Sequence, residues 1–193
     1  MAALVRATRV GCMGIVHAFD PPERFVAGTV GEPGSRTFFL QAREGARLVS
    51  VAIEKEQVAA LAERVDELLD EVMTETTTRT VVPAVAPIGL EDDEPLEQPI
   101  EEEFRGGTMT LSWDPDDERV VIEVFPVGQE PDENGDAGEM LVVRLEPAAA
   151  RSFVQRTALV VGAGRPDCPF CGQPIDPDGH LCVRANGFKR RDP

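Results

Sequence analysis

Hydrophobic and polar positions follow two successive periods in the first half of the chain. Runs rich in Phe, Val and Thr at residues 24–30, 36–43 and 47–53 are separated by Gly-containing turns and predict the strands of an antiparallel meander. Apolar residues at spacings of three and four then predict an amphipathic helix over residues 55–73. This apolar stripe consists of Val58, Leu61, Val65, Leu68 and Val72. We therefore expect a helix that packs on a small sheet.

The same order of patterns returns further along the chain. Residues 108–113 and 119–127 alternate in character around Asp114-Pro115-Asp116-Asp117, a strong turn sequence, and predict a second hairpin. Residues 139–145 predict another strand. A helix is predicted over residues 147–162, since its first residue is a proline, which suits the first helical position, and its last is a glycine.

Together the two parts predict an α+β fold of two pseudo-repeated ββ(β)α units, with antiparallel sheet and the helices packed on one face. A duplication is the economical explanation, because Val51-Ala52-Ile53-Glu54 leads into the first helix as Val143-Arg144-Leu145-Glu146 leads into the second. The two sheets either join edge to edge or pack as pseudo-symmetric halves. The predicted organisation is a loose leader at 1–19, a first repeat at 20–73, an acidic linker at 74–106, a second repeat at 107–164, and a Cys-containing segment with a basic tail at 165–193.

The predicted linker differs from both repeats in composition. Periodicity fails here, and prolines accompany acidic runs at residues 91–94 and 101–103. Such a run is typical of a solvated loop more often than of a binding tail. Four apolar residues nevertheless predict that part of the linker is anchored along the domain surface: Val81, Val82, Val85 and Ile88.

Charge and composition exclude some classes of protein. The 193 residues include 35 acidic and 19 basic side chains, a net charge of -16, which argues against a general nucleic-acid binder. The start of the chain has no apolar run of signal-peptide length, and no later run is long enough to span a membrane. We therefore expect a cytoplasmic protein that is not inserted in a membrane.

The densest chemistry lies near the end of the chain. Cys168-Pro169-Phe170-Cys171-Gly172 is followed by His180 and Cys182, so four metal-ligand side chains fall close together with turn-forming Pro and Gly between them. Cys168, Cys171, His180 and Cys182 match a zinc knuckle with one tetrahedral, closed zinc site. The sequence therefore predicts zinc as a structural cofactor, one ion per chain.

Three alternatives to zinc remain open from the residues alone. Cys168-Pro169-Phe170-Cys171 also resembles a glutaredoxin-type redox pair, but residues 172–179 contain two Pro and two Gly and do not suit the helix that such a pair needs. A disulfide-stapled tail requires an oxidising compartment, whereas Cys12 stands alone and the other cysteines form one cluster. A cluster that holds no metal is the third alternative.

Other candidate residues lack a supporting pattern. Arg184 and residues 189–191 make the end of the chain basic, and Phe170 or Phe188 could stack a nucleobase, which suggests a minor role in contacting single-stranded nucleic acid. The alternative is that these basic residues pair with acidic parts of the same chain. His17 and Asp20 suggest a dyad, but no nucleophile lies near them in the sequence, so ordinary surface hydrogen bonding is the expected role.

Three long stretches resemble one family. Residues 23–31 (ERFVAGTVG), residues 36–43 (RTFFLQAR) and the terminal Cys168-Pro169-Phe170-Cys171-Gly172 with His180-Leu181-Cys182 are similar to the uncharacterised actinobacterial family called domain of unknown function 3090. The resemblance runs from about Met13 to the end of the chain. It implies a cytoplasmic protein and makes the four Cys and His positions a family feature, but it implies no activity.

These observations favour a zinc-stabilised interaction or accessory protein that binds a protein partner, without an evident catalytic site. One alternative is an enzyme or anionic-ligand-binding domain whose site lies between the two repeats and uses Arg24, Arg36 or Arg43. The second is single-stranded nucleic-acid contact through the C-terminal knuckle and basic tail. A pocket with convergent Arg and carboxylate groups would favour the first alternative, and an exposed apolar surface would favour the interaction protein.

Overall fold

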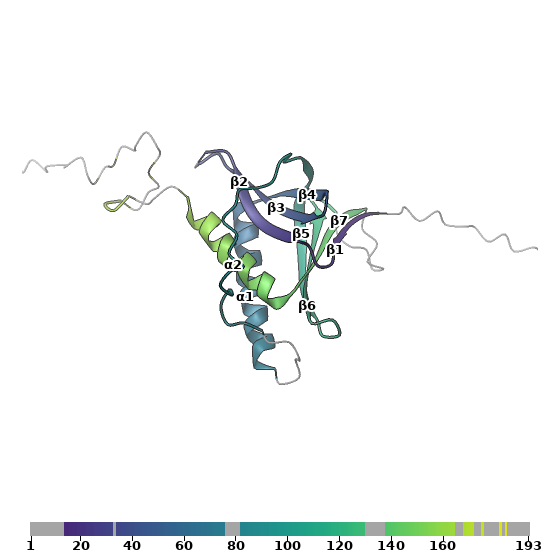
Figure 1. The fold of residues 1–193 in the computed structure, drawn as a ribbon. Coiled ribbons are helices and arrows are strands. Elements are labelled where there is room, and N and C mark those ends of the chain that lie inside the picture. Colours follow the sequence, from purple (N-terminus) through teal and green to yellow (C-terminus); the bar gives the residue numbers. More distant parts are fainter. Residues whose placement is uncertain are drawn as a thin grey trace, which may run out of the picture.

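The α+β prediction is confirmed by the computed structural model, which has a seven-stranded sheet and two helices (Figure 1). The residues that the structure describes are 14–32, 34–75, 82–129, 138–164 and 168–171, with Ile175, Cys182 and Arg184. The strands are β1 (Ile15–Phe19), β2 (Arg24–Val30), β3 (Thr37–Glu44), β4 (Arg47–Ile53), β5 (Glu102–Asp114), β6 (Arg119–Pro126) and β7 (Glu139–Leu145). The helices are α1 (Lys55–Thr74) and α2 (Pro147–Gly162).

The strands form one mixed sheet in the order β1-β7-β6-β5-β4-β3-β2. β2, β3 and β4 form one antiparallel meander, and β5, β6 and β7 form another. β4 and β5 pair in parallel, so the two meanders join edge to edge. The sheet is therefore not antiparallel throughout as predicted, because α1 and the linker form a crossover that brings β5 back in the direction of β4. Each meander precedes a helix, the order expected of a duplication; the duplication itself stays a prediction.

Strand β1 lies where the sequence predicted a loose leader. It pairs in parallel with β7 from Ile15 opposite Glu139 to Phe19 opposite Val143. Phe19 is 1% exposed and belongs to the main core. The prediction of a loose leader at 1–19 is therefore wrong for residues 15–19. A short edge strand of mixed polarity has a weak local pattern, and its place depends on a partner strand far along the chain.

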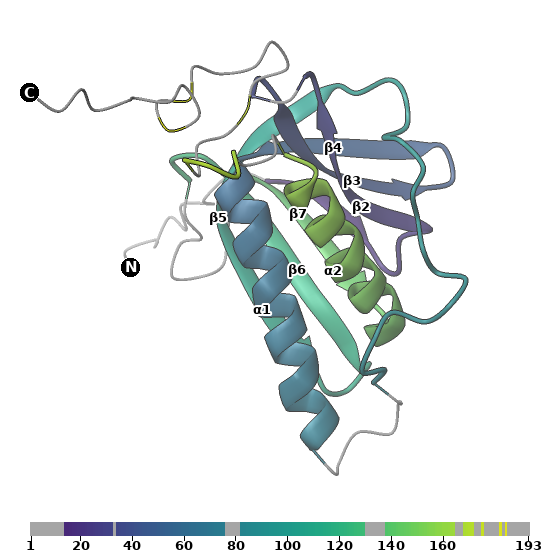
Figure 2. The same cartoon turned by 90° about the vertical axis from the view of Figure 1, so that its left-hand side faces the viewer.

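The main core lies between the sheet and the two helices, which are side by side over one face of the sheet (Figure 2). The predicted apolar stripe of α1 faces this core, although Leu69 is fully buried and Leu68 only partly. α2 packs on β2, where the rings of Phe153 and Phe25 stack with centroids 4.9 Å apart. Within the described residues, neither helix combines the length and apolar character needed to cross a membrane.

The predicted linker covers the opposite face of the first meander. Residues 90–97, which we call the acidic strap, place Leu96 in a second buried cluster. The other buried members of this cluster are Val26, Phe39 and Ala52. Gly28 allows the close approach, because a Cβ at this position would lie 2.5 Å from Leu96 Cδ2. Val85 and Ile88 are exposed as in a solvated loop, whereas the acidic strap is packed on the sheet.

A buried glutamine fixes the acidic strap to β3. Gln41 is 2% exposed, and its Nε2 donates to Ser50 Oγ at 3.0 Å and to the carbonyl oxygen of Glu97 at 3.1 Å. Its Oε1 accepts a hydrogen bond from the Glu97 amide at 2.8 Å. The side chain thus pairs with both backbone polar groups of Glu97, as a neighbouring strand would, and holds the acidic strap in one register.

Candidate functional site

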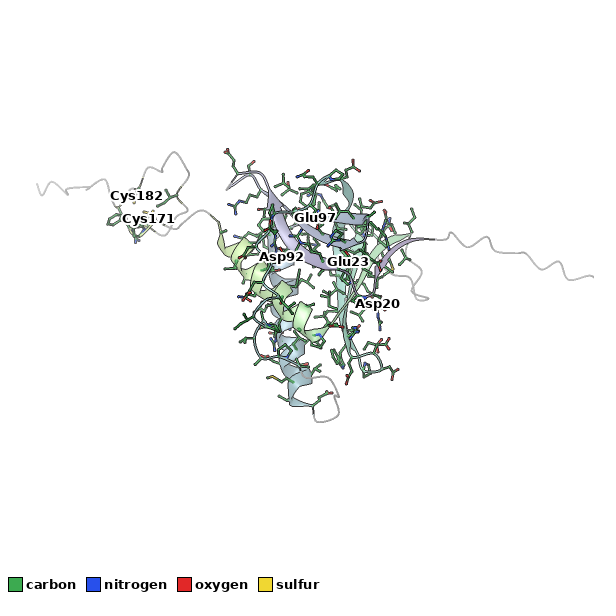
Figure 3. All side chains as sticks on the ribbon, viewed as in Figure 1. Asp20, Glu23, Asp92, Glu97, Cys171 and Cys182 are labelled. Carbon is green, nitrogen blue, oxygen red and sulfur yellow. The ribbon has the colours of Figure 1, made fainter. Side chains whose placement is uncertain are left out.

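Three of the four predicted metal ligands come together near the end of the chain. The thiols of Cys168, Cys171 and Cys182 all lie within 4.8 Å of one another, and the Sγ atoms of Cys168 and Cys182 are 3.6 Å apart. Figure 3 shows Cys171 and Cys182 side by side. Cys168 and Cys182 are buried and Cys171 is half-buried, and none of the three is joined in a disulfide to a described residue. His180, the predicted fourth ligand, lies outside the described residues.

The spacing of these thiols fits a tetrahedral metal shell. Thiolates bound to zinc at about 2.3 Å are about 3.8 Å from one another, close to the distance between Cys168 and Cys182. Residues 169–171 form a turn, whereas a glutaredoxin-type pair would open a helix. Arg184 Nη1 donates to the carbonyl oxygen of Phe170 at 3.2 Å. This hydrogen bond connects the turn that carries Cys171 with the part of the chain that follows Cys182.

The environment of Cys168 favours its ionised form. Burial opposes ionisation and is the largest single influence on this thiol, but backbone amides of Phe170 and Cys171 donate hydrogen bonds to its sulfur, which also forms hydrogen bonds with the thiols of Cys171 and Cys182. Together these hydrogen bonds outweigh burial and lower the pKa of Cys168. A thiolate is the form of cysteine that binds metals, so the turn prepares this residue as a ligand.

A second candidate site lies where the acidic strap meets β2 and α2 (Figure 3). Arg24 donates two hydrogen bonds to the carboxylate of Asp92, from Nε to Oδ2 at 2.6 Å and from Nη2 to Oδ1 at 2.8 Å. Arg156 Nη1 also donates to Asp92 Oδ1 at 2.8 Å, and its Nε donates to the carbonyl oxygen of Ala27 at 2.9 Å. We call Arg24, Asp92 and Arg156 the arginine cluster.

The charges in the arginine cluster change one another's protonation equilibria. The hydrogen bond from Arg24, helped by the charges of Arg24 and Arg156, lowers the pKa of Asp92. The same hydrogen bond raises the pKa of Arg24, whereas burial lowers that of Arg156. Asp92 is thus held as a carboxylate between two guanidinium groups, and the acidic strap is tied to both halves of the fold.

The arginine cluster lines a pocket of about 140 Å³ between β2, the acidic strap and α2. Its other walls include Phe25, Phe153 and Ser152. Of the three arginines predicted to bind an anionic ligand, Arg24 is the one that lines this pocket. Arg43 instead pairs with Glu23 and Glu97, and Arg36 donates to the carbonyl oxygen of Ala163 at 2.7 Å.

Sequence reasoning missed Arg156 and Asp92 as members of this site. Arg156 lies on the buried face of α2 although arginine is rarely buried unless paired. That placement follows from the helical period, because Phe153 and Thr157 on either side are also buried. An arginine on the apolar stripe of a helix was therefore an available signal. Nothing in the acidic run distinguished Asp92 from its neighbours.

His17 and Asp20, the other pair suggested by the sequence, lie with different partners. Asp20 pairs with Arg144, with Oδ2 and Nε 2.9 Å apart. His17 Nε2 lies instead 3.2 Å from Glu139 Oε1. The structure thus gives His17 and Asp20 different charged partners and does not pair them with each other. Of the basic residues predicted for nucleic-acid contact, Arg184 alone lies in the described part of the chain.

An apolar groove of about 230 Å³ runs between the two helices. Its walls are mostly small apolar side chains: Ala59, Ala62, Val154, Ala158 and Val161. Glu63 and Asp66 lie at the same site and give it an acidic border. The hydroxyl of Thr157, which also lines the groove, is buried and has no hydrogen-bond partner among the described residues.

The described structure is a mixed α+β domain followed by a cluster of thiols suited to a metal. The chain belongs to the family described as "Protein of unknown function (DUF3090)", whose model matches residues 17–182. This confirms the family resemblance found in the sequence. No curated protein and no solved structure matches the chain significantly.

Proposed function

We propose that this protein is a zinc-stabilised accessory module that has no catalytic site of its own and binds a protein partner. The convergence of Cys168, Cys171 and Cys182 within 4.8 Å is the observation that supports the zinc-stabilised part. In this proposal these thiolates and His180 bind one zinc ion. Four protein ligands complete a tetrahedral shell and leave no position for a substrate, so the metal is structural. Clustered cysteines without a disulfide among the described residues agree with a reducing cytoplasm.

Metal analysis of the purified full chain tests the zinc site. We expect about one zinc per chain in protein prepared without chelator, and loss of this zinc in the double variant Cys168→Ser, Cys171→Ser. Cys12→Ser is the matched control, because it removes a thiol outside the cluster and should retain the metal. Wild-type protein without bound zinc, or a double variant that binds it as well as wild type, would overturn the zinc proposal.

The groove between α1 and α2 is the surface that we propose for the partner. Its small side chains leave an open apolar surface where two helices meet, which suits an inserted apolar segment. Asp66 is paired with Arg151, so Glu63 and the net charge of -16 are the features that favour basic residues beside that segment.

Two variants of equal charge on α2 test this surface. Affinity capture from the native host identifies the partner, and calorimetry with the purified partner then measures its affinity. Ala158→Glu places a charge in the groove and should weaken binding at least about tenfold, since a buried unpaired charge is costly. Gln155→Glu, on the same helix but outside the groove, should bind normally. Equal affinity of the two variants would exclude the groove as the binding surface.

The arginine cluster supports one alternative, an anionic-ligand-binding domain. Its pocket lies between β2 of the first half and α2 of the second, and guanidinium and carboxylate groups converge there. Asp92 forms ion pairs with both Arg24 and Arg156, so an anionic ligand must displace its carboxylate to bind them. If this alternative is right, Asp92→Asn binds inorganic phosphate more tightly than wild type in a calorimetric titration. Absence of phosphate binding in both proteins would exclude phosphate as the ligand of this pocket.

A further inference from the structure

A second cluster of potential metal ligands among the described residues includes a side chain of the edge strand β1. His17 Nε2 is 3.2 Å from Glu139 Oε1 and 3.8 Å from Glu103 Oε1, and the three ligand atoms all lie within 4.8 Å of one another. We call these residues the His17 cluster. The side chain of His17 is 12% exposed, and those of Glu139 and Glu103 are 25% and 43% exposed. The imidazole is therefore nearly enclosed, while one carboxylate faces solvent.

Three different strands position these side chains. β1 pairs in parallel with β7, with Ile15 opposite Glu139, so His17 extends from the same edge pairing as Glu139. Glu103 comes from β5 at an irregularity in its pairing with β4, where the ladder passes from Glu102 directly to Phe104. A bulged residue is released from the alternation of its strand, and such bulges commonly aim side chains at functional sites. The bulge thus leaves Glu103 outside the β4–β5 pairing.

The charges of the His17 cluster do not balance. Neither Glu103 nor Glu139 forms an ion pair with a lysine or arginine of the described residues, and the imidazole of His17 is the partner that they share. In the arginine cluster, by contrast, two guanidinium groups surround one carboxylate. Two carboxylates brought together without an arginine repel each other, and a bound cation removes that repulsion.

We propose that the His17 cluster binds a divalent transition-metal cation through His17 Nε2 and the carboxylates of Glu103 and Glu139. Nitrogen and oxygen ligands about 2.1 Å from a tetrahedral metal lie about 3.4 Å apart, between the two distances observed here. One imidazole with two carboxylates suits Mn²⁺ or Zn²⁺. Three protein ligands leave coordination positions for water, unlike the closed site proposed at the cysteines. This site is independent of the zinc proposal.

Electron paramagnetic resonance of Mn²⁺ added to the full chain tests the proposal, because bound and free Mn²⁺ differ in signal. Mn²⁺ prefers oxygen and nitrogen to thiolate ligands, so the probe distinguishes this site from the cysteines. We expect one Mn²⁺ per chain, and binding at least tenfold weaker in His17→Gln, Glu103→Gln and Glu139→Gln. Glu102→Gln is the matched control: it neutralises the neighbouring carboxylate and should bind as wild type does. Cys168→Ser, Cys171→Ser should also bind normally.

Nuclear magnetic resonance gives a second measurement. It uses the wild-type chain alone, so it does not depend on whether the variants fold. Substoichiometric Mn²⁺ should broaden the imidazole signals of His17, one of two histidines in the chain, before those of His180. The proposal is overturned if no Mn²⁺ binds at millimolar concentration, if the His17 signals stay sharp, or if Glu103→Gln and Glu139→Gln bind as tightly as Glu102→Gln.

Discussion

The arginine cluster and the His17 cluster are both half-buried groups of charges, but they differ in how the charges are matched. In the arginine cluster, Asp92 lies between Arg24 and Arg156, and its carboxylate accepts hydrogen bonds from both. In the His17 cluster, two carboxylates share one imidazole. In a cluster whose charges balance, the ion pairs join segments of the fold and no additional ion is required. An unmatched cluster keeps ligand atoms together and leaves positive charge to be supplied by another group.

The largest expected effect comes from removing Arg156. Its guanidinium donates to Asp92 and to the carbonyl oxygens of Ala27 and Glu94, so Arg156→Ala breaks a buried ion pair and leaves acceptors unpaired. We expect the free energy of unfolding to fall by about 3 kcal/mol in denaturant titrations. Arg64→Ala, which removes an exposed pair with Glu67, should cost about 0–1 kcal/mol. Similar losses in the two variants would show that the arginine cluster does not hold the fold together.

The packing of the acidic strap gives the next effect. Leu96→Ala should lower the free energy of unfolding by about 2.5 kcal/mol, since it empties a buried site. Gly28→Ala should also destabilise, because its Cβ would collide with Leu96 Cδ2. In the Leu96→Ala background the added methyl fills part of the space, so Gly28→Ala should cost less there. Additive losses in this double-mutant cycle would contradict the contact.

Neutralising Asp92 should have a smaller, pH-dependent effect. The pKa of Asp92 is lowered in the folded state, chiefly by the hydrogen bond from Arg24, so its carboxylate stabilises the fold above the unfolded pKa of about 3.9. This stabilisation is lost as the pH falls through the folded pKa. Asp92→Asn should therefore be about 1.5 kcal/mol less stable at pH 7, and the difference should shrink below about pH 4.

Asp93→Asn is the matched control for this measurement, because Asp93 is the exposed neighbour in the same acidic strap. The unfolding curves of Asp93→Asn should follow those of wild type at pH 7 and at pH 3. A difference between Asp92→Asn and wild type that stays constant from pH 7 to pH 3 would indicate that packing, and not the carboxylate charge, sets the contribution of Asp92.

The smallest expected effect is in the His17 cluster without metal. Glu103→Gln removes one of two repelling carboxylates and breaks only a 3.8 Å pair with His17, so we expect a change of less than about 0.5 kcal/mol in EDTA. With Mn²⁺ at 100 times its dissociation constant, wild type should gain about 2.7 kcal/mol and the variant much less. A loss in EDTA as large as that of Asp92→Asn would mean that the two clusters have the same structural role.

Much of the fold could be predicted from local pattern. The bounds predicted for β2, β4, β7 and α2 agree with the structure, and α1 differs by one residue at its end. Each of these elements has a clear period and a turn or cap residue at its ends, so neighbouring residues alone identify it. β1 and the first residues of β5 lack such a pattern and were assigned to the leader and the linker.

The candidate sites differ in the same way. The cysteines are close in sequence, so their spacing predicted that Cys168, Cys171 and Cys182 would converge. Arg24, Asp92 and Arg156 come from a strand, the strap and a helix far apart in the chain. The sequence therefore singled out Arg24 as a residue that could bind an anionic ligand. In the structure its guanidinium binds the carboxylate of Asp92 instead.

The sequence by itself determined the family, the α+β class, most strands and helices, and the thiol cluster, because each depends on residues close together in the chain. Tertiary structure alone decided that β4 and β5 pair in parallel, that the acidic strap packs on the sheet, and that His17, Glu103 and Glu139 meet. Each of these outcomes depends on groups far apart in the chain. Several segments can pair with the same strand edge, and several charged side chains can pair with the same opposite charge. Such competition is settled by the packing of the whole domain.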